Sequence, residues 1–154
     1  MKKIGRMISI TAVVLVVALC AIAVTACGTQ TGSYEGTYSY KSGAATITST
    51  VTFTVGDDGM IWDTVITNTS SDPSVAAPGI GQRPWDGTKV TGKIDGNWAP
   101  SEIEDIVVEV DENGVPSGKI TADREFPTNL GYEVGVAAAV LAMQNALEAG
   151  PVAE

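Results

Sequence analysis

Histidine is absent from this 154-residue chain, and cysteine is nearly absent, with two residues. Without histidine there is no Ser-His-Asp triad, no histidine metal site and no ordinary histidine acid–base catalysis. Both cysteines, Cys20 and Cys27, lie in the N-terminal part of the chain. The rest of the sequence therefore has no thiol for a disulfide, a nucleophile or a cysteine-ligated metal. Hydrolysis would have to rely on carboxylates, lysine or tyrosine, so the composition favours a non-catalytic protein over an enzyme.

The N-terminal segment has the pattern of an export signal. Three basic residues fall within the first six positions, and residues 7–26 then carry no charge. A basic start, an apolar stretch and small residues before a cut site are typical of a secretory signal. The ending Val24-Thr25-Ala26-Cys27 resembles the lipobox of bacterial lipoproteins, which implies a signal peptide over 1–26 and an acylated Cys27. The chain would then be held in the cell membrane on its extracytoplasmic side; the alternative is a plain transmembrane anchor, for which the stretch is long enough.

The net charge of the chain limits the kinds of partner that it can bind. Cleavage before Cys27 would leave 128 residues, which is the size of one domain. Lys plus Arg would fall from 9 to 6 against 18 Asp and Glu, so the net charge would go from −9 to −12. An anionic domain is repelled by phosphate backbones. We therefore expect no nucleic acid as a partner. The expected partners are the lipid bilayer, through an acylated Cys27, and a redox partner or an envelope ligand.

The first half of the mature chain predicts antiparallel strands. Residues 27–33 form a short polar tether, and one domain is expected over 34–150. Within 46–55 the residues alternate, with threonines on one face and an apolar face that Ser49 alone interrupts. This alternation, a glycine-flanked turn at 56–59 and a return strand over 61–66 predict a β-hairpin. Three tyrosines at alternate or nearby positions before it predict an edge strand: Tyr34, Tyr38 and Tyr40.

The second half predicts two more strands and one helix. Residues 69–88 are rich in proline and glycine and are expected to form a loop. Strands are expected over 103–110 and 117–123. A helix is expected over 132–148, with Asn129 as its cap and Gly150 at its end. The predicted class is α+β, a small twisted antiparallel sheet packed by one C-terminal helix.

A glycine-rich segment follows the predicted hairpin. Pro78-Gly79-Ile80-Gly81 is either a simple turn or a backbone cradle for a phosphate. With the hairpin before it and a glycine-led, alanine-rich helix after it, this segment resembles the FMN-binding domain family, which includes extracytoplasmic flavin lipoproteins used in electron transfer. Gly135 stands where covalent members carry the flavinylated threonine, so the resemblance implies non-covalent FMN. The residues expected to hold it are Pro78, Gly79, Ile80, Gly81, Leu130, Gly131 and Tyr132.

Two functions follow from these patterns. One is a lipid-tethered electron carrier with FMN between the Pro-Gly-Ile-Gly segment and the start of the C-terminal helix, where a helix N-terminus favours phosphate. The other is an envelope binding or structural module that keeps the fold without flavin. The family's missing threonine and Glu-Thr pair, replaced here by Gly135 and Ala76-Ala77, favour the module, and Glu133 counts against the carrier because its carboxylate would repel the phosphate. For Trp85 and Trp98 the sequence favours structural packing, with stacking on a ligand as the alternative, and Trp62 is expected in the core. The acidic turns lack the spacing of a calcium loop and are interpreted as solvated.

Overall fold

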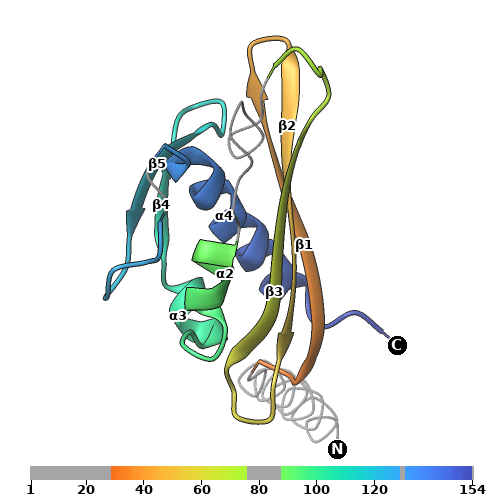
Figure 1. Ribbon diagram of the computed structural model, residues 1–154, viewed down its shortest axis with the longest axis vertical. Helices are drawn as coiled ribbons and strands as arrows, with labels where there is room; N and C mark the ends of the chain where they lie inside the picture. The colour runs from red at the N-terminus through yellow and green to blue at the C-terminus, as the bar shows by residue number, and fades with distance from the viewer. Residues whose placement is uncertain (1–28, 76–87, 129–130, 154) are drawn as a thin grey trace, which may run out of the picture.

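A computed structural model of the protein describes residues 29–75, 88–128 and 131–153. Three strands form an antiparallel sheet in the order β1-β2-β3, and a separate hairpin pairs β4 with β5. The long helix α4 lies between that sheet and the β4–β5 hairpin (Figure 1). This arrangement confirms the α+β prediction. The elements are β1 (Gly32–Ser42), β2 (Ala45–Val55), β3 (Ile61–Ser70), α2 (Thr88–Ile94), α3 (Pro100–Glu104), β4 (Val107–Val110), β5 (Pro116–Thr121) and α4 (Glu133–Ala149).

The predicted hairpin is confirmed as β2 and β3. Every second residue of β2 from Ala45 to Val55 is buried, and Ser49 is among the buried residues. Gly59 in the connecting turn has a φ of 75°, a conformation that glycine adopts without strain. The predicted edge strand is β1, which pairs with β2 along its whole length. Local alternation and turn chemistry therefore suffice to specify this part of the fold.

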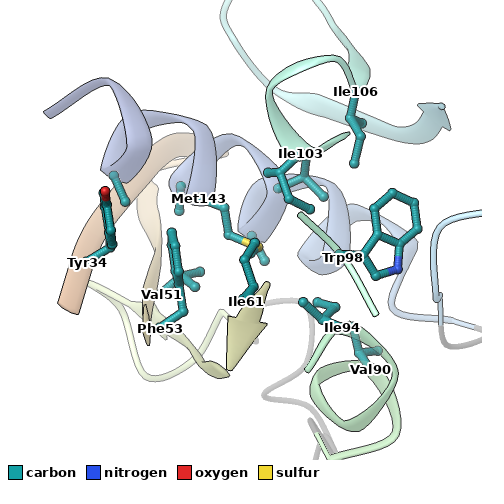
Figure 2. Close-up of a cluster of buried hydrophobic side chains, with 14 of the residues drawn as sticks. Tyr34, Val51, Phe53, Ile61, Val90, Ile94, Trp98, Ile103, Ile106 and Met143 are labelled. Atoms are coloured by element: carbon teal, nitrogen blue, oxygen red, sulfur yellow. The ribbon is translucent and has the colours of Figure 1, made fainter. Parts of the chain in front are cut away.

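Helix α4 packs closely on β1 because Gly36 has no side chain. A Cβ atom at that position would lie 2.1 Å from the carbonyl oxygen of Ala142. Asn145 adds a direct link, since its Nδ2 donates to the carbonyl of Thr37 at 2.8 Å. Figure 2 shows Met143 of α4 in the main core, between the sheet and the side chains that α2 and α3 contribute. The small residues of α4 and β1 therefore set the distance between the helix and the sheet.

The prediction of one strand over 103–110 is wrong in its first half. Residues Pro100–Glu104 form α3, and the strand begins only at Val107. Proline is favoured in the first turn of a helix, and the Glu102 carboxylate accepts the Ala99 backbone N–H at 2.8 Å. Ile103 and Ile106 are both buried on one side of this turn, a spacing of three that alternation does not detect. The return strand β5 is confirmed.

The expected loop over 69–88 is also shorter than predicted. Strand β3 extends to Ser70, and the sequence analysis missed α2, which begins at Thr88. Val90 and Ile94, one helical turn apart, are fully buried and anchor one side of α2 in the core. Residues 76–87 lie outside the described residues.

The predicted C-terminal helix is confirmed, with Gly150 at its C-terminal end at a φ of 85°. The predicted cap Asn129 falls outside the described residues, and Tyr132 is the N-cap residue. Within the described ranges, no helix has both the length and the apolar character needed to cross a membrane.

Candidate functional site

Two residues of the predicted flavin site can be placed. Gly131 and Tyr132 lie at the start of α4, where the sequence puts them, and Gly131 has a φ of 86°. Gly131 is exposed, whereas Tyr132 is half-buried. The other predicted residues are outside the described part of the chain, as is the predicted lipidation site: Pro78, Gly79, Ile80, Gly81, Leu130 and Cys27.

The first turn of α4 already holds a carboxylate. Oε1 of Glu133 accepts the backbone N–H of Gly131 at 3.1 Å. Hydrogen bonds from the backbone N–H groups of Glu133 itself and of Gly131 hold the pKa of this carboxyl below its usual value. A phosphate at this helix start would meet that negative charge and compete for the same N–H groups. The described residues therefore do not fit the phosphate of FMN here, and flavin binding stays a prediction.

Two of the three tryptophans can be placed: Trp98 packs in the core, which is the interpretation that the sequence favoured, whereas the prediction of Trp62 in the core is wrong. Trp98 is only 3% exposed, with Phe126 packed edge-on at 4.9 Å between ring centroids. Its position after α2 directs the ring into the main core, beside Ile94 and Val90 (Figure 2). Trp62, expected in the core, is 42% exposed because β3 turns it to the outer side of the sheet. Trp85 lies outside the described residues.

Arg124 lies over the Trp98 ring. Its guanidinium carbon lies 3.9 Å from the ring centroid, and it pairs with Glu102 through Nε at 2.9 Å and Nη2 at 3.0 Å. The Ala99 N–H and, next, Arg124 hold the pKa of Glu102 below its usual value. The adjoining open hollow of about 420 Å³ is lined by Arg124 and Lys93, but also by Glu125. Because Arg124 is committed to Glu102 and Trp98, this hollow offers no concentrated positive charge.

Three polar side chains that the sequence analysis did not assign lie together on the inner face of the β1–β3 sheet. Ser49 is paired with Asn68, and Tyr40 is paired with Ile47, the neighbouring inward residue of β2. All three are buried. Within the described ranges, Oη of Tyr40, Oγ of Ser49 and both amide atoms of Asn68 have no hydrogen-bond partner. We call these three residues the inner polar cluster; its one sequence signal is the interruption by Ser49 of an apolar face.

The acidic turn between β2 and β3 is internally bonded. Asp58 accepts the Trp62 indole N–H at 3.0 Å and the backbone N–H of Met60 at 3.0 Å. Among the residues that the structure describes, no three His, Cys, Asp or Glu side chains come together as a group that could hold a metal ion.

Comparisons of the chain with known proteins add nothing to these assignments. No protein-family description, curated protein or solved structure matches the chain. The resemblance to the FMN-binding domain family therefore stays a prediction, and the site has to be argued from its own residues.

Proposed function

We propose that this chain is an extracytoplasmic lipoprotein whose single α+β domain is a non-catalytic binding module of the cell envelope, without a redox cofactor. One observation carries the choice between the two functions that the sequence leaves open. The carboxylate of Glu133 occupies the first turn of α4, the place where an electron carrier of this type would need to bind the FMN phosphate. A binding module has no such requirement.

The sequence supports the anchor. A basic start, an uncharged stretch over 7–26 and the ending Val24-Thr25-Ala26-Cys27 fit a lipoprotein signal. Strand β1 begins at Gly32, five positions after Cys27. Five residues span at most about 18 Å, so an acylated Cys27 would hold the domain next to the bilayer. Two or more acyl chains make such an anchor stable.

Lipid labelling tests the anchor. In cells supplied with radiolabelled palmitate, the wild-type chain should become labelled and sediment with membranes. Cys27→Ser should lose the label, whereas the matched control Cys20→Ser should keep it. An unlabelled wild-type chain that still sediments with membranes would identify the apolar stretch as a transmembrane anchor and overturn the lipoprotein proposal.

Absorbance spectroscopy tests the absence of a flavin. The purified protein should be colourless and should not retain added FMN after desalting. The control is Glu133→Gln, which keeps an acceptor for the Gly131 N–H and removes the charge. FMN retained by Glu133→Gln alone would show that the carboxylate excludes the phosphate. Flavin bands in the wild-type protein that survive desalting would instead establish the electron carrier.

A further inference from the structure

The inner polar cluster lies at the end of the sheet where β1 runs into β2, at the top of Figure 1. Ser49 and Asn68 are directly opposite on neighbouring strands, a placement that puts their Cβ atoms about 5 Å apart. Tyr40 lies on β1 opposite Ile47, which is two residues before Ser49 on β2, so Tyr40 is a diagonal neighbour of Ser49. Strand alternation turns all three side chains to the face that α4 covers. Three buried polar side chains from three strands therefore occupy neighbouring positions on one face of the sheet.

Folding alone does not account for this cluster. A buried polar atom without a partner costs about 1–3 kcal/mol, and more than about nine in ten buried polar groups are bonded. Here four such atoms are concentrated on three side chains that are at most 5% exposed. One further atom of this kind, Oγ1 of Thr64, lies four residues before Asn68 on β3. Apolar residues at these three positions would avoid the cost, as they do elsewhere on the inner face of β2.

Apolar side chains pack around Tyr40, one member of the cluster. Tyr40 belongs to a small core cluster with Ile47 and Ala138, against which further partly buried residues pack: Tyr38, Val75, Val115 and Val134. None of these side chains carries a charge. The Tyr38 hydroxyl donates to the Gly114 carbonyl at 2.6 Å, so it is already bonded. Burial raises the pKa of Tyr40 to about 12, which keeps its phenol neutral and able to donate.

We propose that the inner polar cluster is a binding site for a small uncharged molecule that carries a carboxamide or lactam group. The amide of Asn68 presents a donor and an acceptor side by side, which pair with the acceptor and donor of another amide. The hydroxyls of Ser49 and Tyr40 can donate or accept. A charged ligand is disfavoured because, among the described residues, neither the cluster itself nor the apolar side chains around Tyr40 carry a charge that would compensate it. The inference rests on the proposed binding function, for which it names the ligand class.

Matched pairs of probes test the ligand class. Acetamide, nicotinamide and uracil are uncharged, and acetate, nicotinate and orotate are their anionic counterparts. We expect at least one uncharged probe to raise the melting temperature of the full chain, purified from membranes in detergent, and its anion to have no effect. Equal responses to both members of every pair, or no response to any of the three uncharged probes, would overturn the proposal.

Variants link the response to the cluster. Asn68→Leu, Ser49→Ala and Tyr40→Phe each remove hydrogen-bonding atoms while keeping most of the volume. Without a probe they should melt at or above the wild-type temperature, and each should weaken probe binding at least tenfold. Thr67→Val, on the exposed outer face beside Asn68, is the matched control and should bind as the wild type does. Lower melting temperatures in the cluster variants, with probe binding unchanged, would assign these groups a structural role and overturn the site.

The two proposals can fail separately. A lipid-labelled, colourless protein that ignores all three uncharged probes loses only the ligand class. A flavin spectrum in the wild-type protein, or the absence of lipid from Cys27, overturns the proposed function whatever the probes do.

Discussion

Gly36→Ala should weaken the packing of α4 on the sheet. The added Cβ would lie 2.1 Å from the carbonyl oxygen of Ala142 and 2.7 Å from the backbone nitrogen of Ala146. Both atoms belong to the helix backbone, so no side-chain rotation relieves the overlap, and α4 has to move outward by about 1 Å. Overpacking of this kind costs about 1–3 kcal/mol, against a gain of about 0.5–1 kcal/mol from replacing glycine in a strand.

The net loss should be about 1 kcal/mol, which lowers the melting temperature by roughly 4 °C in a domain of this size. Thermal unfolding followed by circular dichroism measures it. The matched control is Gly92→Ala in α2, where a Cβ would meet nothing within 4 Å. Alanine is the better helix former, so this control should gain about 0.5–1 kcal/mol. If Gly36→Ala melted within 2 °C of the wild type while the control rose, the close contact between α4 and β1 would be refuted.

Three further predictions concern titration and exposure. Because burial raises the pKa of Tyr40 from 10.0 to about 12, the free energy of unfolding should be unaffected below pH 10 and fall between pH 10 and 12. Tyr40→Phe should remove that decrease, and an unchanged alkaline profile would contradict it. Hydrogen bonds lower the pKa of Glu102 in the folded protein from its ordinary value of 4.5. Their contribution to the free energy of unfolding should therefore be present above pH 4.5 and be lost as the pH falls through the lowered pKa. Glu102→Gln should reduce the fall in the free energy of unfolding at acid pH, measured by urea titration at several pH values. An equal fall in the wild type and the variant would contradict this prediction. Acrylamide should quench Trp62 more than Trp98, so Trp62→Phe should lower the quenchable fraction of the fluorescence, and no change would place Trp62 in the interior.

Sequence reasoning succeeded where the structure depends on neighbours along the chain. The period of two in β2, the glycine at the end of the turn and the run of small apolar residues in α4 are local signals. The same reasoning misread 103–110 because the buried pair Ile103 and Ile106 is three residues apart, and a strand pattern was fitted across a helix end. It missed α2 because a seven-residue helix with a glycine inside it has little intrinsic propensity and forms through burial of Val90 and Ile94.

The candidate site, like the fold, depends partly on local sequence signals and partly on tertiary packing. The sequence by itself determined the α+β class, the β2–β3 hairpin, the C-terminal helix and the excess of negative charge, since periodicity, turn residues and composition are properties of the chain. Only the tertiary structure decided that Trp98 is buried under Arg124, that Trp62 is exposed, and that Ser49 lies opposite Asn68. Burial and register depend on which distant segments pack together, and a single sequence does not encode that choice in any local pattern.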